Sequence, residues 1–212
     1  MNATDRPVLY GLSRSVYTRI ARLALEEKGV DYALVEVEIF GPEGVPPEHY
    51  ARHPFGRIPA FVHGDFSLYE TAAITRYVDE EFTGPRLQPS SPRARARMNQ
   101  VIGVLDAYAY RPMIWDVGVQ RISIPREGGT TDEAIVARAL PVIETCLQSL
   151  EKLLGRRRFL ADDELSLADL HAAPMFIYFN LTPEGRSMLA RHAALNNWLT
   201  RMQTRPSVLA IR

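Results

Sequence analysis

The sequence predicts a two-part protein of the α/β plus all-α class, in which a small α/β domain precedes an all-helical domain. Strand-like and helix-like patterns alternate over roughly the first 80 residues. The stretch "GPRLQPSSP" at 84–92 is dense in glycine, proline and serine, which is typical of a linker. Beyond it the apolar spacing is almost purely helical. We therefore expect domains at 1–83 and 93–212, joined by a linker at 84–92.

The elements of the first domain follow from the apolar pattern and from where turn residues interrupt it. The expected order is strand, helix, strand, irregular loop, strand, strand, helix, at 8–11, 15–29, 35–39, 41–47, 58–62, 66–69 and from 71 onward. The strict alternation in "VEVEI" indicates a half-buried strand at 35–39. His63-Gly64-Asp65 between two apolar runs predicts a hairpin.

In the second domain we expect four helices and one mobile surface loop. The helices are predicted at 93–119, 132–154, 167–179 and 186–202, with the loop at 123–131. "SLAD" at 166–169 has the form of a capping box, in which Ser166 and Asp169 bond each other's backbone N–H groups. This device starts a helix and carries no chemistry of its own.

Composition excludes several classes of function. The 212 residues contain 25 basic and 25 acidic side chains, so no net charge attracts nucleic acid or an anionic membrane. No apolar stretch approaches the roughly 18 to 20 residues of a spanning helix. One cysteine permits no internal disulfide, and the five histidines lack metal-ligand spacing, so we expect no metal site. A soluble cytoplasmic protein is the expectation.

Ile58-Pro59 is the first candidate feature for ligand binding. Proline has no N–H for a sheet, so it belongs at the start or edge of a strand. A bend there, with a cis bond, would leave the backbone of Ile58 facing outward and able to pair with an extended peptide. The alternative is a proline that begins a strand and binds nothing.

Glu70-Thr71 is the second candidate feature. Thr71 suits the N-cap of the following helix, whose free N–H groups and positive dipole end can hold a carboxylate. Glu70 beside it can hold an ammonium group. Together the two residues suit a free amino-acid head group, whereas the alternative is an ordinary cap preceded by a surface glutamate.

These features together resemble the glutathione S-transferase superfamily. "HPFGRIPAFVHGDFSLYETAAITRYV" resembles its glutathione-site segment, "LYGLSRSVYTRIARLALEEKGVDY" its first strand and helix, and "SLAD" its C-terminal capping box. The resemblance covers nearly the whole chain in the right order. It implies a thioredoxin-like first domain, a cytosolic homodimer, glutathione as co-substrate, and transfer of glutathione to a small hydrophobic electrophile in detoxification.

The resemblance also assigns roles to matching positions. Ile58 would pair its backbone with the cysteine of glutathione, Pro59 would be the cis-proline, and Glu70 and Thr71 would hold the γ-glutamyl group. Arg57 would meet a glutathione carboxylate or lie on the surface. One position departs from the family: "GVPPEH" has Pro46 where a basic residue often holds the glycine carboxylate.

Ser15 falls where serine-type members hold the catalytic hydroxyl. A hydroxyl that donates to the glutathione sulfur at a helix N-terminus favours the thiolate. The alternative for Ser15 is a plain N-cap, and the two functions are compatible. Ser13, Tyr10 and Tyr17 remain open as other sources of the hydroxyl. A cysteine-dependent version is excluded, because the first domain contains no cysteine.

The pocket for the electrophile is expected between the domains. Large apolar or aromatic candidates are Tyr17, Tyr108, Met113 and Trp115, although such residues more often belong to a core. The alternative function is a non-catalytic binding or regulatory protein with the same fold.

Overall fold

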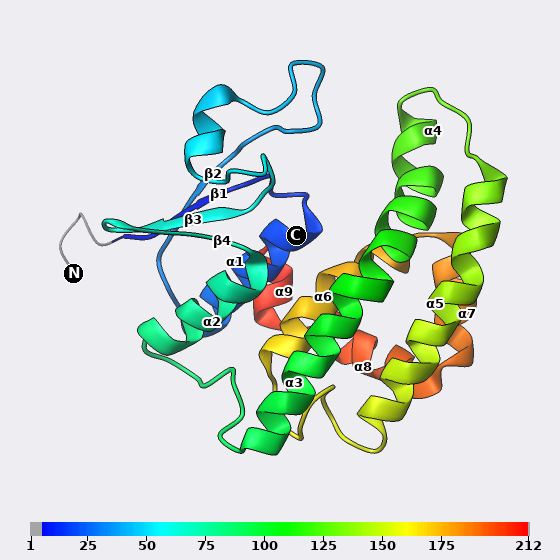
Figure 1. The fold of residues 1–212 in the computed structure, drawn as a ribbon. Coiled ribbons are helices and arrows are strands. Elements are labelled where there is room, and N and C mark those ends of the chain that lie inside the picture. The colour runs from blue at the N-terminus through cyan, green and yellow to red at the C-terminus, as the bar shows by residue number, and fades with distance from the viewer. Residues whose placement is uncertain (1–5, 212) are drawn as a thin grey trace. The chain divides into compact units, whose positions relative to one another are not determined.

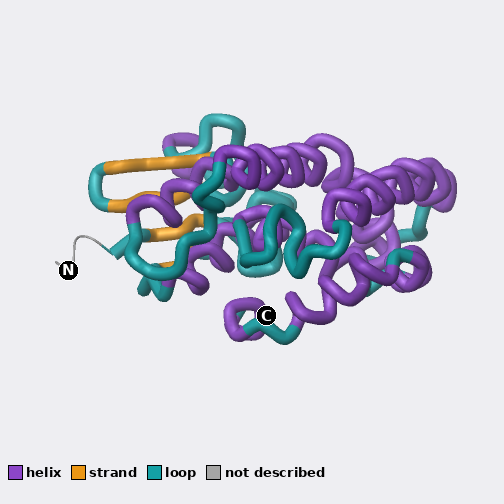
Figure 2. The backbone as a smooth tube through the Cα atoms, turned by 90° about the horizontal axis from the view of Figure 1, so that it is seen from below, coloured by secondary structure: helices purple, strands orange, loops and turns teal. Residues whose placement is uncertain are grey.

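The computed structural model describes residues 6–211, and they divide into two compact units. One unit runs to Leu87 and also includes the chain from Pro206 onward, and the other spans Gln88–Arg205. All strands of the described residues lie in the first unit, whereas the second consists of helices and loops (Figure 2). We expected a single domain at 93–212, whereas the residues from Pro206 onward group with the first unit.

The first unit is built on a four-stranded mixed sheet with the order β2-β1-β3-β4. The strands are β1 Val8–Tyr10, β2 Ala33–Val35, β3 Ala60–His63 and β4 Phe66–Tyr69. β1 pairs parallel to β2 and antiparallel to β3, and β3 pairs antiparallel to β4. Gly64 takes a φ of 61° in the β3–β4 turn, a conformation that glycine adopts without strain.

The strand predicted at 35–39 lies earlier in the chain, at 33–35. β1 offers partners only from Val8 to Tyr10, so the ladder ends at Val35. The next residues bind the loop after β1 instead. A Glu36 carboxylate oxygen accepts from the Ser13 N–H at 3.1 Å, and Glu38 forms an ion pair with Arg14 at 2.6 Å.

Two packed helices cover one face of this sheet, α1 Val16–Lys28 and α2 Thr71–Glu81 (Figure 1). Their C-terminal ends are joined by a buried ion pair between Lys28 and Asp79, with Nζ 3.2 Å from Oδ1. Asp79 also accepts from the backbone N–H of Leu87. This network fixes the chain where it leaves the first unit. A short 3₁₀ helix, η1 at Pro47–Ala51, lies between β2 and β3.

The segment 92–126 is helical throughout, beyond the predicted end at 119. α3 Pro92–Val104 and α4 Ile124–Arg126 enclose two π-helical stretches, η2 Leu105–Ala109 and η3 Arg111–Ser123, and the ribbon runs on from α3 to α4 (Figure 1). The N–H of Tyr110 bonds the carbonyl of Leu105, five residues back. The predicted loop at 123–131 therefore begins only after Arg126.

The other helices of the second unit are α5 Glu133–Leu154, α6 Leu167–Phe179, α7 Pro183–Arg191 and α8 Ala193–Gln203. α6 is buried on nearly all sides and packs against α3, η3, α7 and α8. The predicted capping box starts it: Asp169 accepts from the N–H and the hydroxyl of Ser166, from the N–H of Leu160 and from the indole of Trp198. One buried carboxylate thus joins three segments.

The helix predicted at 186–202 is divided at His192, whose φ of −108° and ψ of 74° are not helical. Its ring nitrogens lie 2.7 Å from a Glu151 oxygen and 3.1 Å from a Glu144 oxygen. Glu151 also accepts from the N–H of Ala194 at the start of α8. Contacts with α5 therefore fix the bend.

The last helix, α9 Pro206–Ala210, packs on α1 in the first unit. The Ser207 hydroxyl bonds Glu27, and Val208 is 3% exposed. The single cysteine, Cys146, is buried in α5, and burial raises the pKa of its thiol. Between residues 6 and 211, no helix is long and apolar enough to cross a membrane.

Candidate functional site

One end of the sheet gathers the predicted glutathione-binding residues. Tyr10, Ala60 and Tyr69 stand side by side in the register of β1, β3 and β4. The chain leaves Tyr10 toward Ser15, enters Ala60 from Ile58-Pro59, and leaves Tyr69 into Glu70. Segments up to 60 positions apart in sequence therefore meet at one edge.

Ser15 is the N-cap residue of α1, but its side chain makes no capping hydrogen bond. The first turn of α1 contains no acidic residue, so the positive end of the helix is not neutralised there. The loop before it is held by Arg19, whose Nε donates to the carbonyl of Ser13 at 3.0 Å. This arrangement leaves the Ser15 hydroxyl available to a ligand beside a helix N-terminus.

The peptide bond between Ile58 and Pro59 is cis, as expected. The ladder starts at Ala60, so Ile58 stands outside the β1–β3 pairing. The side chain of Ile58 is buried with Leu12 and Val37. Its backbone is therefore anchored from one side, without a strand partner in the sheet.

Glu70, rather than Thr71, occupies the N-cap position of α2, and its φ is 69°. It is the one non-glycine residue with positive φ among those the structure describes. The carbonyl of Glu70 accepts from Ala73 and Ile74, which leaves the N–H groups of Thr71 and Ala72 without a backbone partner in residues 6–211. Thr71 is buried as the first helical residue.

Two buried histidines support this edge, and sequence reasoning did not single them out. His49 is 0% and His53 3% exposed. His49 Nε2 lies 2.7 Å from the carbonyl of Arg57, which can only accept, so Nε2 carries the hydrogen. Neither histidine has metal-ligand spacing, and the available signal was the place of "PEH" just before the glutathione segment and of His53 as its first residue.

Burial lowers the pKa of His53, and the charge of Glu70 opposes that shift. The ring of His53 lies 4.9 Å from the ring of Tyr69, the neighbour of Glu70. His53 is thus electrostatically coupled to the proposed head-group carboxylate. No group of three or more His, Cys, Asp or Glu residues suited to a metal ion occurs in the described part of the chain.

A hollow of about 620 Å³ lies next to this edge in the first unit. Its lining includes Tyr10, Pro46 and His49 together with the acidic residues Glu36, Glu38, Glu43 and Glu48. Arg52 also lines it, with its guanidinium 4.3 Å from the centre of the Tyr10 ring. Arg57 is exposed and lies outside this lining.

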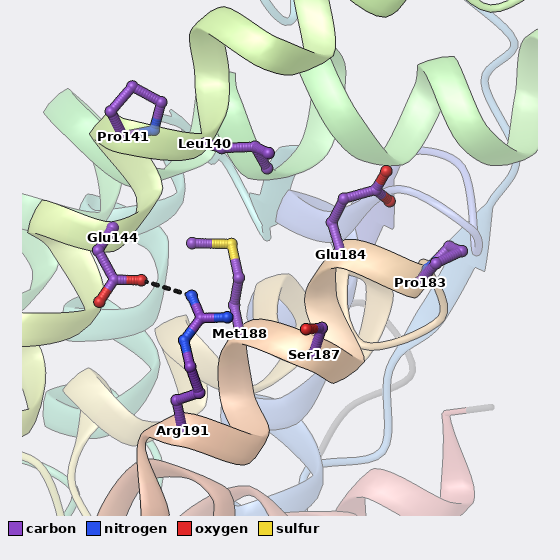
Figure 3. Close-up of a pocket in the computed structure, with 8 residues that line it drawn as sticks. All are labelled: Leu140, Pro141, Glu144, Pro183, Glu184, Ser187, Met188 and Arg191. Atoms are coloured by element: carbon purple, nitrogen blue, oxygen red, sulfur yellow. Dashed lines mark hydrogen bonds and ion pairs between the residues drawn. The ribbon is translucent and has the colours of Figure 1, made fainter.

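A second hollow, of about 590 Å³, lies in the helical unit between α5 and α7 (Figure 3). Arg191 and Glu144 form an ion pair of 3.0 Å across it, and Leu140, Pro141 and Met188 supply apolar surface. The residues predicted for the electrophile do not line this hollow. Met113 is fully buried, Tyr108 is 63% exposed, and Tyr17 and Trp115 are half-buried.

Comparison with known proteins agrees with this geometry. Residues 8–80 match the family model for the glutathione S-transferase N-terminal domain, and residues 133–201 match a model for the C-terminal domain. Glutathione S-transferase 1 of Zea mays is 33% identical over 200 residues, which cover 94% of this chain and 92% of the relative. Glutathione S-transferase F6 of Arabidopsis thaliana is 29% identical over 94% of this chain and 95% of its own.

Solved structures agree over almost the whole length. A glutathione S-transferase I bound to lactoylglutathione superposes with a TM-score of 0.87 at 31% identity, covering 97% of this chain and 98% of that one. The maize glutathione S-transferase I in complex with an atrazine–glutathione conjugate gives 0.85 at 30% identity, covering 97% and 96%. The first unit therefore has the thioredoxin-like fold, and the chain belongs to the glutathione S-transferase family.

Proposed function

We propose that this glutathione transferase activates the thiol of glutathione with the hydroxyl of Ser15 and transfers the thiolate to a small hydrophobic electrophile. The observation that supports the proposal is the register of Tyr10, Ala60 and Tyr69 at one end of the sheet, since the chain continues from them to Ser15, Ile58 and Glu70. Relatives of similar length have been solved with lactoylglutathione and with an atrazine–glutathione conjugate.

Glutathione would bind through its three residues in turn. The Glu70 carboxylate accepts from the γ-glutamyl ammonium, and the N–H groups of Thr71 and Ala72 donate to the α-carboxylate beside it. The cysteine residue pairs with the backbone of Ile58. Arg57, exposed just before that strand, supplies a cation for the glycine carboxylate in place of the basic residue absent at Pro46.

Ser15 would act on the sulfur itself. A free thiol has a pKa of roughly 8.5, so only a small fraction is thiolate at neutral pH. A hydrogen bond donated by the hydroxyl and the positive end of α1 both favour the charged sulfur. The thiol proton leaves to solvent, and the thiolate forms a C–S bond to the electrophile while the leaving group departs with its electron pair.

The substitution Ser15→Ala tests the proposal, with Ser13→Ala as its matched control two residues away. We expect Ser15→Ala to lower turnover of a generic aromatic electrophile at least about tenfold and to change glutathione affinity little. Ser13→Ala should retain the original rate, because the hydrogen bonds that Ser13 forms with Glu36 and Arg19 use its backbone N–H and carbonyl rather than its hydroxyl. An unchanged rate in Ser15→Ala would transfer the role to Tyr10 or Tyr17.

The binding-only alternative gives a different result in the same assays. A binding or regulatory protein would be stabilised thermally by millimolar glutathione yet would turn over no electrophile. If free glutathione does not stabilise the protein and an immobilised-glutathione column does not retain it, the proposed glutathione site is wrong.

For the electrophile we keep Tyr17, Tyr108, Met113 and Trp115 as proposed contacts. Tyr108 is the accessible member of the set, whereas Met113 would act from a core position. Tyr108→Ala should therefore raise the KM for an aromatic electrophile and leave that for glutathione unchanged. If Tyr108→Ala has the same KM for the electrophile as the parent, Tyr108 does not belong to the pocket.

We also propose a cytoplasmic homodimer. Phe55 is 70% exposed and packs edge-on to the ring of Tyr69, itself 39% exposed, so the first unit presents an uncovered aromatic surface. A second copy of the chain is the proposed cover. Phe55→Asp should convert a dimer to a monomer in sedimentation, and a parent protein that sediments as a monomer would contradict the assignment.

A further inference from the structure

We propose that His53 is a positioning residue for glutathione binding, and that its protonation weakens the hold of Glu70 on the γ-glutamyl ammonium. The inference rests on the proposed function, since it concerns the same head-group site. In this proposal His53 acts on the ligand through the charge of Glu70.

The position of His53 carries the argument. Its ring is 3% exposed and is enclosed by aromatic neighbours, with Tyr69 at 4.9 Å, Phe55 at 6.2 Å and His49 at 6.3 Å between ring centres. Its backbone is fixed on both sides, because its N–H donates to His49 and its carbonyl accepts from Gly56. These contacts hold the ring against Tyr69, the last residue of β4 and the sequence neighbour of Glu70.

The electrostatic surroundings favour a neutral ring at neutral pH. Nδ1 of His53 is buried and has no hydrogen-bond partner in the described residues. A protonated ring would have to place an N–H donor there unsatisfied, which is costly. Burial lowers the pKa of His53 most, and the charges of His49 and Arg57 lower it further. The charge of Glu70 and, to a smaller extent, an interaction with the backbone of His53 itself raise it.

The consequence for binding follows from linkage. With His53 neutral, the charge of Glu70 is fully available to the ammonium group of the ligand. A cation on His53 would share that charge, and conversely a bound ammonium removes the main interaction that favours the cation. Because the coupling is reciprocal, binding lowers the pKa of His53. Affinity therefore falls as pH falls through the lowered pKa that His53 has in the free protein.

The test uses S-methylglutathione, which keeps the head group and has no thiol to titrate. Its affinity is measured by calorimetry from pH 5 to 7 on the full chain, His53→Asn and His63→Asn. His63 is the matched control, since it pairs with Phe66 at the far end of the hairpin and bonds Tyr77.

We expect the affinity of the parent and of His63→Asn to fall roughly fivefold from pH 7 to pH 5, and that of His53→Asn to fall much less. In parallel, the parent should release protons on binding at the acidic end of this range, and His53→Asn should release fewer, as read from buffers of different ionisation enthalpy. A pH profile in His53→Asn equal to the parent's overturns the inference while the proposed site stands. Failure of the parent to bind S-methylglutathione at any pH overturns both.

If His53→Asn does not fold, NMR titration of the parent decides the matter. The His53 ring should titrate at lower pH with saturating S-methylglutathione than without it. An unchanged or raised midpoint in the bound state contradicts the inference.

Discussion

At the scale of a single residue, Glu70 has a strained backbone that costs folding free energy and places its carboxylate at the candidate site. A glutamate with a φ of 69° and a ψ of 110° lies outside the conformations that L-residues prefer. Such strain costs about 1 to 3 kcal/mol and persists where the surrounding structure or a function requires it. Here the carboxylate stands directly before the free N–H groups of α2, which a relaxed backbone would move.

Two substitutions separate the strain from the charge. Glu70→Gly removes both, so we expect the free energy of unfolding to rise by about 1 kcal/mol while affinity for glutathione falls at least roughly tenfold. Glu70→Gln keeps the strained backbone and should lose affinity without gaining stability. Urea unfolding and calorimetry measure the two quantities, and a Glu70→Gly protein with unchanged affinity would contradict the head-group assignment.

The sequence draws attention to several residues of the candidate site, because the proline and the Glu-Thr pair break local rules. Proline at the start of a strand and an anion before a helix both required an explanation beyond propensity. His49 and His53 could not be found in this way, since the sequence does not show that a histidine is buried, and the neighbours of these two lie up to 16 positions away. The N-cap was assigned to Thr71 because a positive φ at Glu70 has no local sequence signal.

At the scale of elements, side chains on one helix decide where another helix starts or stops. Asp169 accepts four hydrogen bonds from Leu160, Ser166 and Trp198 and so aligns α6 with a preceding loop and with α8. Glu144 and Glu151 likewise hold His192 in the break between α7 and α8.

Asp169→Asn should destabilise the protein strongly. One of the two acceptor oxygens becomes an NH₂ group that faces buried donors, and the expected loss is about 3 kcal/mol of unfolding free energy. Asp163→Asn is the control, because Asp163 is exposed in the loop just before the box. Chemical denaturation of both variants measures the difference, and equal midpoints would mean that the capping box contributes little.

Glu144 predicts an acid-dependent loss of stability. Burial favours its neutral form, but hydrogen bonds from Arg191, Gln148 and His192 outweigh that effect and lower the pKa of the carboxyl. A lowered pKa means that the contribution is present above about pH 4.5 and is lost as pH falls through the folded-state pKa.

Glu144→Gln should therefore be less stable than the parent near neutral pH, with the difference narrowing toward pH 3. Thermal unfolding across that range measures it, and exposed Glu127→Gln supplies the comparison. A difference that stays constant with pH would show that the Glu144 charge does not contribute.

Helices and strands whose ends are marked by local sequence motifs were predicted closely. Those whose ends depend on contacts with distant residues were not. α6 begins at its capping box and ends at Phe179 as predicted. The strand expected at 35–39 failed because a three-residue β1 offers no partner beyond Val35, and alternation alone does not reveal strand length. The break at His192 depends on carboxylates more than forty positions earlier, which periodicity does not register.

At the scale of the whole molecule, the first unit is completed by the last residues of the chain. Val208 of α9 and Ile211, which follows it, are 3% and 4% exposed, and the Ile211 carbonyl accepts from Arg22 of α1. The sequence order suggested two domains in succession, and nothing in a five-residue helix signals which unit it joins.

Val208→Asp and Leu209→Asp form a matched pair for this contact. Val208 is buried, whereas its neighbour Leu209 is 49% exposed. A buried unpaired carboxylate should cost about 3 kcal/mol of stability in Val208→Asp, and Leu209→Asp should cost little. Thermal unfolding compares them, and similar midpoints would show that α9 does not stabilise the first unit.

The single cysteine has a consequence for how this protein withstands oxidation. Cys146 is buried in α5 with a pKa raised by burial, and the proposed glutathione site uses a hydroxyl. Oxidised glutathione therefore finds no exposed thiol for thiol–disulfide exchange. We expect the protein not to form mixed disulfides with glutathione. Because Cys146 is buried, a single cysteine introduced on the surface would be the thiol that reacts with a spectroscopic label.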